Sequence, residues 1–378
     1  MTSVRRHAAR GLVALAAAVA VSAPLAAPAV AAPAATETPA AAQSVTGKPV
    51  VRPDVVGHRG ASGYRPEHTR AAYELAFALG ADAVEPDIVA TRDGVLVLRH
   101  ENEISGTTDI ADHPELAHLR ATKVVDGHEL TGWFTEDLTW EQVSTLRARE
   151  RLPETRTGSA TFDGRFRILR LSDLRDIVDE QSERLGRELV MVAEIKHATH
   201  FESVGLPLDE LVAADLAGWA TPQNLVVESF EQGVLGRVRA RGIPGRYIFL
   251  LEDAGAPADL VARDGAAARS YADHLTPEGL ARLASEVDGV SVDRTMLDVD
   301  LVARVHAAGL VAFTWTLRAE NRFLPRELRR GGEPRDFGDW LTEFRSILAT
   351  GVDGVFADQP DLVLSALESD ARRRLDQP

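Results

Sequence analysis

The chain has 378 residues, of which 45% are hydrophobic and 26% charged, and a formal net charge of −15. This composition is typical of a folded globular protein long enough for one large α/β barrel or two smaller domains. The negative charge argues against general binding of nucleic acid. The absence of cysteine excludes disulfides and a lipid attached to cysteine.

The N-terminus has the pattern of a targeting segment. Arginines at positions 5, 6 and 10 precede an apolar run over residues 11–23, and Ala29–Ala31 supplies a small-x-small cleavage pattern. The run is too short for a membrane span. We therefore expect a cleavable signal peptide over residues 1–31, by the general secretory route or the twin-arginine route, and a disordered leader over 32–52.

The folded part is expected to begin at residue 53 with three apolar segments that carry polar residues at their ends. A helix is predicted over residues 70–79, between the first segment and the second. An Asp93-Gly94 turn separates the second segment from the third, so these two are expected to pair as a hairpin. Strand ends are where parallel α/β enzymes place their chemistry. The polar residues are His58, Arg59, Glu85, Asp87 and His100.

These residue types point to phosphoryl transfer. Glu85 and Asp87 are two apart on one predicted strand, so both face one side and need a cation, for which calcium or magnesium is suited. His58 and His100 suit acid–base work, and the fork of Arg59 fits a phosphate. Each signal alone has an ordinary explanation as a solvated histidine, a surface salt bridge or a tight turn. Their joint occurrence at successive strand ends favours a site.

A long segment without extended apolar runs separates His100 from Glu194. We expect a helix capped by Thr139 and Gln142 that reaches about Arg149, and a second helix from Leu171 to Ile177. The rest of this segment, including residues 127–137 and 153–167, is expected to be ordered loop. The segment either walls the site or stabilises the fold away from it, and the sequence leaves both open.

From Leu189 onward strands and helices alternate regularly. Ser229 and Gln232 have the spacing of a capping box for the helix that ends before Gly242. This alternation predicts a parallel sheet, and about eight units predict a closed barrel of the TIM type. The predicted strands cover 190–194, 225–228, 247–251, 289–292, 310–317 and 354–357, and the predicted helices 209–219, 277–284, 300–308 and 337–349.

The motifs together resemble those of the glycerophosphodiester phosphodiesterases, over roughly residues 54 to 365. Two positions depart from the family pattern: His68 stands where the family usually has Asn, and Glu101 stands where it has Asp. The matching motifs are His58-Arg59-Gly60, Pro66-Glu67-His68-Thr69, Glu85-Pro86-Asp87, Thr91-Arg92-Asp93-Gly94, His100, Glu194-Ile195-Lys196, Ser229-Phe230, Trp315-Thr316 and the run from Gly354 to Pro360.

The resemblance implies a TIM-type (β/α)8 barrel of the phospholipase C-like phosphodiesterase kind over residues 53–368, with an insertion over about 101–188 and a polar tail over 369–378. It implies hydrolysis of a small glycerophosphodiester to an alcohol and sn-glycerol 3-phosphate, with no nucleic acid and no stable membrane anchor as partner. The oligomeric state is left open. The chain resembles the periplasmic type of this family, which has a comparable insertion and a run like Gly132–Asp137.

The resemblance also implies roles for individual residues. Glu85, Asp87 and Glu194 would hold one divalent cation, with calcium favoured over magnesium, and Arg59 and Lys196 would neutralise the phosphate. His58 and His100 would alternate as base and acid, in an order left open. Trp315 is either an apolar wall against the glycerol moiety or a core tryptophan.

Two other functions compete with this one. A phospholipase C- or D-like enzyme would act on intact lipid, and a long exposed apolar loop would favour it, but the sequence shows none. A non-catalytic extracellular protein could bind phosphodiesters or teichoic-acid-like polymers. Loss of a catalytic histidine or a ligand would indicate such a protein, and all of them are present.

Overall fold

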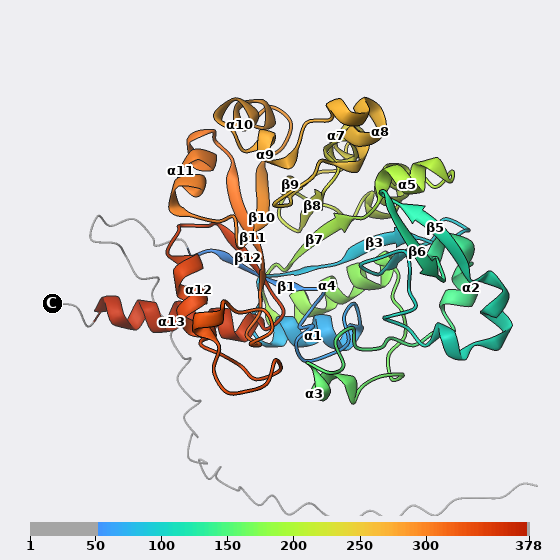
Figure 1. Ribbon diagram of the computed structural model, residues 1–378, viewed down its shortest axis with the longest axis horizontal. Helices are drawn as coiled ribbons and strands as arrows, with labels where there is room; N and C mark the ends of the chain where they lie inside the picture. The colour runs from blue at the N-terminus through green and yellow to red at the C-terminus, as the bar shows by residue number, and fades with distance from the viewer. Residues whose placement is uncertain (1–51, 376–378) are drawn as a thin grey trace, which may run out of the picture. The chain divides into compact units, whose positions relative to one another are not determined.

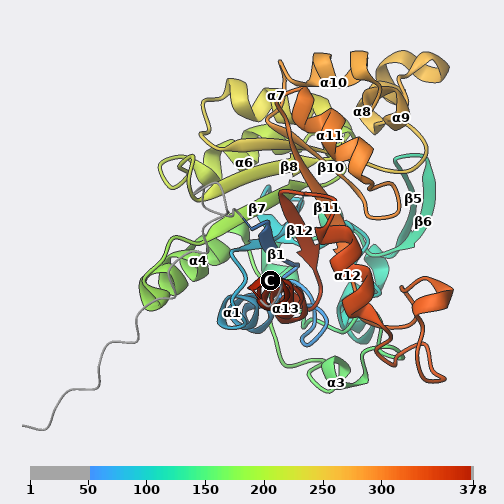
Figure 2. The same ribbon diagram turned by 90° about the vertical axis from the view of Figure 1, so that its left-hand side faces the viewer.

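The computed structural model describes residues 52–375, and eight parallel strands in it close into a barrel, as predicted. Strand β2 pairs with β1 on one side and with β7 on the other, which completes the ring. Helices lie around the outside of the strands (Figures 1 and 2). The barrel strands are β1 (Asp54–His58), β2 (Ala83–Glu85), β7 (Val190–Ile195), β8 (Leu225–Ser229), β9 (Arg246–Leu251), β10 (Gly289–Asp293), β11 (Val311–Leu317) and β12 (Gly354–Ala357). The predicted signal peptide and residues 32–51 of the leader lie outside the described residues.

Side chains alternate between the two faces of the barrel wall. On β8, Val226 faces the inner cluster, which also contains Phe313 and Phe356, whereas Leu225 and Val227 face the helices. This period of two is the geometry of a strand, and burial of both faces explains the nearly continuous apolar runs in the sequence. The interior is therefore packed with side chains, and polar residues are left to the strand ends.

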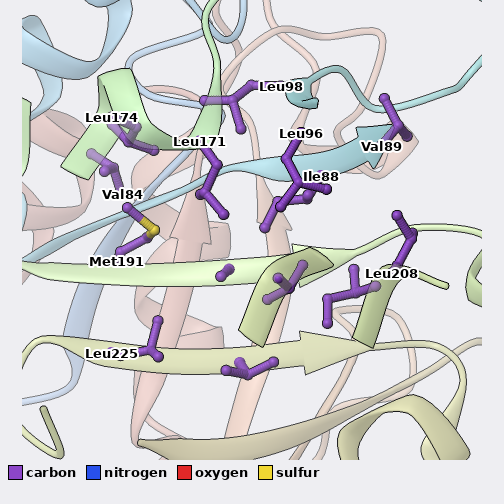
Figure 3. Close-up of a cluster of buried hydrophobic side chains, with 14 of the residues drawn as sticks. Val84, Ile88, Val89, Leu96, Leu98, Leu171, Leu174, Met191, Leu208 and Leu225 are labelled. Atoms are coloured by element: carbon purple, nitrogen blue, oxygen red, sulfur yellow. The ribbon is translucent and has the colours of Figure 1, made fainter. Parts of the chain in front are cut away.

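The helices pack their apolar faces on the outer side of the wall. Figure 3 shows Leu171 and Leu174 of one helix, α4, beside Val84, Leu96 and Leu98. The α-helices are α1 (Arg70–Ala78), α2 (Trp140–Val143), α3 (Thr157–Ala160), α4 (Leu171–Leu185), α5 (Ala198–Ser203), α6 (Leu208–Leu216), α7 (Gln232–Ala240), α8 (Ala258–Asp264), α9 (Tyr271–His274), α10 (Pro277–Leu283), α11 (Val299–Ala307), α12 (Trp340–Leu348) and α13 (Pro360–Leu375). The short 3-10 helices are η1 (Ile110–Asp112), η2 (Pro114–Leu119), η3 (Thr135–Asp137), η4 (Gly265–Ala267) and η5 (Arg326–Leu328). Among residues 52–375, none of the helices is both long and apolar enough to cross a bilayer.

The hairpin predicted around the Asp93-Gly94 turn is confirmed. Strand β3 (Asp87–Ala90) pairs antiparallel with β4 (Leu96–Leu98), which lies outside the barrel ring. The sequence analysis placed Glu85 and Asp87 on one strand, whereas the structure divides them between β2 and β3 at Pro86. Proline lacks the backbone N–H that a continuous ladder needs, which accounts for the break.

The insertion differs most from expectation. Residues 127–137 are not simply loop, because β5 (Ala121–Val125) and β6 (His128–Gly132) form an antiparallel hairpin. The Thr139–Gln142 capping box is present, but its helix α2 ends at Val143 rather than near Arg149. The capping box expected from Ser229 is absent, because its hydroxyl donates to the Ile195 carbonyl oxygen over 2.8 Å and Glu231 takes the N-cap position.

The remaining differences are smaller. Helix α4 continues to Leu185, eight residues beyond the predicted end at Ile177. The short helix α3 lies within residues 153–167, which were expected to be loop. Three more helices were not predicted: α5 after β7, and α8 and α9 between β9 and β10. Helix α12 begins at Trp340 rather than at residue 337. Helix α13 continues to Leu375, so the first part of the predicted polar tail is helical.

Candidate active site

The carboxyl-terminal ends of the barrel strands open into a cavity of about 960 Å³. Seven of the eight predicted site residues line it: His58, Arg59, Glu85, His100, Glu194, Lys196 and Trp315. The eighth, Asp87, lies beneath it, buried against Arg59 and Lys196. The chain therefore gathers all the predicted site residues in one place, at the end where barrel enzymes hold their substrates.

Each of the two histidines is held by a carboxylate. Nδ1 of His58, at the end of β1, lies 2.6 Å from Oδ1 of Asp358, and Nδ1 of His100 lies 2.5 Å from Oε1 of Glu101. A carboxylate at Nδ1 favours the tautomer in which Nδ1 carries the proton. Nε2 of each ring is then an acceptor that can take a proton from a substrate.

Burial keeps both histidines neutral. Burial and the nearby Arg59 lower the pKa of His58 to about 4, against the opposing effect of Asp358. Burial, Arg59 and Lys196 lower the pKa of His100 to about 3. Both rings are therefore neutral in the free protein near pH 7 and either can act as a base.

Two arginines of the insertion stand behind these carboxylates. Arg151 donates to both oxygens of Glu101, over 2.8 and 2.7 Å, and to both oxygens of Glu67, over 2.8 and 2.7 Å. Arg156 contacts Asp358 and donates to Glu320 over 2.8 Å. The insertion also supplies Val124, Asp126 and His128 to the cavity lining. It therefore borders the site instead of lying far from it.

Three buried carboxylates meet in the floor of the cavity. Glu85, Glu194 and Glu228 each offer an oxygen within 4.8 Å of the other two. Oε1 of Glu85 and Oε2 of Glu228 are buried without a hydrogen-bond partner. Burial raises the pKa of all three, and that of Glu194 to about 8. Orphaned oxygens in a cluster of like charges fit a hard divalent cation such as calcium or magnesium.

Asp87 is already surrounded by nitrogen donors. Its Oδ2 lies 2.9 Å from Nε2 of His68 and 3.1 Å from Nε of Arg59, and its Oδ1 lies 3.6 Å from Nζ of Lys196. Burial opposes ionisation, but His100, Arg59 and Lys196 hold the pKa of Asp87 well below its usual range. Its Oδ1 has no hydrogen-bond partner, so Asp87 can still offer one oxygen to a cation.

The local fold aims Arg59 at these carboxylates. Its backbone takes the left-handed region, with φ of 60°, and its N–H donates to Oε2 of Glu85 over 2.9 Å. Gly60 follows with φ of 86°, and a Cβ there would lie 2.5 Å from the Ala72 carbonyl carbon, so only glycine fits. The guanidinium also pairs with Glu67 over 3.2 Å. Arg59 thus both fixes the loop and faces the cavity.

Trp315 and the partners of the histidines complete the site. Trp315 is half-buried and packs edge-on against Phe230, with ring centroids 5.6 Å apart, so it faces the cavity and is not an enclosed core residue. Glu228, Asp358 and Arg151 were missed by the sequence analysis. Glu228 carries the signal that marked Glu194, a carboxylate near a strand end. Asp358 contacts His58, 300 residues away in the sequence, and Arg151 acts on His100 only through Glu101.

Neutral histidines that can exchange protons lie here beside buried cations that can counter a phosphate, an arrangement that suits phosphoryl transfer. On a TIM barrel, this arrangement points to the class of barrel phosphodiesterases. The chain belongs to the glycerophosphoryl diester phosphodiesterase family, whose profile matches residues 58–362. It is accordingly a hydrolase of phosphoric diesters.

Individual relatives agree over nearly the whole chain. The chain is 30% identical to the glycerophosphodiester phosphodiesterase GDPD6 of Arabidopsis thaliana, over 84% of this chain and 87% of the relative. It is 26% identical to the glycerophosphodiester phosphodiesterase of Treponema pallidum, over 84% and 92%. Two solved structures share the fold: a phosphodiesterase of Oleispira antarctica in complex with the product sn-glycerol-3-phosphate, at 18% identity, and a glycerophosphodiester phosphodiesterase of Parabacteroides distasonis, at 14%. The Oleispira antarctica structure has a TM-score of 0.57, and the match covers 84% of this chain and 97% of that one. The Parabacteroides distasonis structure has a TM-score of 0.52, and the match covers 85% of this chain and 99% of that one.

Proposed function

We propose that this protein is an exported, divalent-metal-dependent enzyme that hydrolyses glycerophosphodiesters to an alcohol and sn-glycerol 3-phosphate. The observation that carries the proposal is the pair of neutral histidines, His58 and His100, each fixed by a carboxylate and facing one cavity with Arg59 and Lys196. The product named for the Oleispira antarctica structure supports the phosphate-containing product.

The residues suit a two-step reaction. In the first step, one histidine takes the proton of the glycerol hydroxyl next to the phosphate while the oxygen of that hydroxyl bonds to phosphorus and forms a cyclic phosphate. The other histidine gives a proton to the oxygen of the departing alcohol as its bond to phosphorus breaks. The bound phosphodiester anion favours protonation of a nearby imidazole, which supplies that acid. Water then opens the cyclic phosphate with the two roles exchanged. The order in which the histidines act is left open.

The cations hold the anion during both steps. Arg59 and Lys196 can counter charge that builds on the phosphoryl oxygens. A divalent ion bound by Glu85, Glu194 and Glu228, with an oxygen of Asp87, would supply Lewis-acid polarisation of a phosphoryl oxygen. Lys196 already donates to Glu194 over 2.7 Å, so it is placed beside that cluster.

One assay tests the catalytic proposal. Purified protein is given glycerophosphocholine or phosphatidylcholine vesicles, with and without a chelator, and glycerol 3-phosphate and choline are measured. Release of both products from the soluble diester alone, lost on chelation and restored by calcium or magnesium, is expected. Cleavage of the vesicles would favour the lipid enzyme, and tight binding without turnover would favour a non-catalytic binding protein.

Export has a separate test. The motivation is the Arg-rich start, apolar run and Ala29–Ala31 pattern of the sequence. N-terminal sequencing of protein recovered from outside the cytoplasm should begin at Ala32 or Pro33. Recovery of the uncleaved chain from the cytoplasm alone would contradict export.

A further inference from the structure

The cavity continues beyond the catalytic residues into a second region, which we call the acidic lobe: Asp126, Glu231, Glu252 and Tyr271. All four line the same cavity as His58. They come from the β5–β6 turn, the loops after β8 and β9, and helix α9. Helix α5 and the β5–β6 hairpin lie side by side in Figure 1, and Nδ1 of His197 joins them through Oδ2 of Asp126 at 2.6 Å.

Carboxylates that no lysine or arginine pairs with dominate this lobe. The lysine and arginines that line the cavity are already paired elsewhere: Lys196 with Glu194, Arg59 with Glu67, Arg318 with Asp358 and Arg294 with Glu343. None of the three lobe carboxylates has a lysine or arginine partner among the ion pairs of residues 52–375. A ligand group that enters the lobe therefore meets carboxylates without fixed countercharge.

Glu231 is the strongest single indication. It is 3% exposed, its Oε2 accepts from the Thr199 N–H over 2.9 Å, and its Oε1 is buried without a partner. Burial raises the pKa of Glu231 to about 7, and the like charges of Asp126 and Asp259 add to this effect. A buried carboxylate without a cation is costly, so a cationic ligand would stabilise it.

The geometry favours a large cation over a metal ion. In residues 52–375, only Glu85, Glu194 and Glu228 converge within 4.8 Å, so the lobe carboxylates do not form a tight metal cage. Aromatic rings lie beside the lobe instead. Phe230 packs edge-on against Tyr271 and Trp315, with ring centroids 6.4 and 5.6 Å apart. Carboxylates together with aromatic faces are the surroundings that bind organic ammonium groups.

We propose that the acidic lobe binds the ammonium group of the departing alcohol, and so selects glycerophosphodiesters of cationic amino alcohols over neutral ones. This rests on the proposed function, because the lobe is continuous with that catalytic cavity. The glycerol moiety carries no charge, so the carboxylates favour the other alcohol of the diester. Nζ of Lys196 lies 5.3 Å from the centroid of the Phe230 ring and 2.7 Å from Oε1 of Glu194, so it can hold the phosphate beside the lobe.

The test separates charge from shape. Glycerophosphocholine is compared with its uncharged isostere, in which a tert-butyl group replaces the trimethylammonium, and the ratio of kcat/KM is measured. The wild type should prefer the cation about tenfold or more, because a desolvated ammonium gains from both carboxylates and rings. Glu231→Gln should lower the ratio about five- to tenfold, and Glu252→Gln about threefold, since Glu252 is exposed and screened. Glu278→Gln, an exposed carboxylate outside the cavity, is the matched control and should leave the ratio unchanged.

The outcomes distinguish this inference from the proposed function. Equal kcat/KM values for the two substrates in the wild type would overturn the lobe assignment and leave the phosphodiesterase intact. Turnover of neither substrate would overturn the proposed function itself. If Glu231→Gln folds poorly, the wild-type ratio and Glu252→Gln still decide the matter. A ratio unchanged by Glu252→Gln and by added salt would contradict the electrostatic account.

Discussion

Arg151 offers the sharpest test of how the insertion supports catalysis. Its guanidinium makes two bidentate pairs, one with Glu67 and one with Glu101, and Glu101 in turn holds His100. Arg151→Met keeps much of the side-chain volume and removes the charge. We expect a modest loss of stability and a larger loss of turnover, because Glu101 would no longer be held in place.

The stability cost follows from burial. The side chain of Glu67 is 5% exposed, and breaking a buried ion pair costs about 3–5 kcal/mol of folding free energy. Because Arg59 remains 3.2 Å from Glu67 as a second partner, we expect the loss of the Arg151–Glu67 pair to cost about 2 kcal/mol. Glu101 is 32% exposed, so its pair adds at most about 1 kcal/mol. The two losses together amount to about 3 kcal/mol. With an unfolding entropy of about 2.1 cal/mol/K per residue over some 320 residues, this loss of stability corresponds to a fall in Tm of about 4 °C.

The kinetic effect distinguishes positioning from mere stability. In Arg151→Met, kcat should fall about tenfold or more with KM nearly unchanged, as for residues that orient a reacting group. Arg151→Lys should restore only part of kcat, since lysine lacks the fork. In a His100→Ala background, Arg151→Met should cost almost nothing further, because the group it positions is gone.

Arg149→Met is the matched control for Arg151→Met. Arg149 lies in the same loop and pairs with the exposed Asp112, so both Tm and kcat should stay close to wild type. A fall in Tm without any fall in kcat for Arg151→Met would refute the reasoning. An additive kcat loss in the His100→Ala background would refute it as well.

Three further predictions follow from the same geometry. His58→Ala should fold with a Tm close to wild type and lose about 10²–10⁴ in kcat, and near wild-type turnover would remove its catalytic role. At saturating metal, the acidic limb of the kcat/KM profile should have its midpoint near pH 4 or below, because the pKa values of His58 and His100 are lowered to about 4 and about 3 and the base must be unprotonated; an acidic limb with its midpoint near 6.5 would contradict this. Glu228→Gln should weaken calcium or magnesium binding about tenfold or more by titration calorimetry. The metal-free Tm should change little, because burial and the neighbouring carboxylates raise the pKa of Glu228 and a neutral amide avoids the same burial and repulsion; unchanged affinity would exclude Glu228 as a ligand.

The barrel and most of the site could be predicted because their signals are local. Apolar runs with strand periodicity end in residues such as His58 and Glu194, and parallel strands bring such ends together. The β5–β6 hairpin also had a local signal, the Asp126-Gly127 turn, and was missed because its strands are short and largely solvent-facing.

The carboxylate that holds His58 and the arginine that holds Glu101 could not be found in this way. Asp358 lies 300 residues from His58 in the sequence and reaches it only because β12 closes the ring against β1. Arg151 lies in a segment without periodicity, where no pattern indicates which way a side chain points. The carboxylates of the acidic lobe likewise come from three separate loops, and only the folded chain gathers them.

Phosphorus NMR of the reaction with glycerophosphocholine tests the central claim most directly, because it identifies the bond that breaks. With a divalent cation, the protein should convert the diester signal to that of sn-glycerol 3-phosphate, and His58→Ala and His100→Ala should leave the diester intact. Appearance of phosphocholine in its place, or undiminished conversion by either folded variant, would contradict the account.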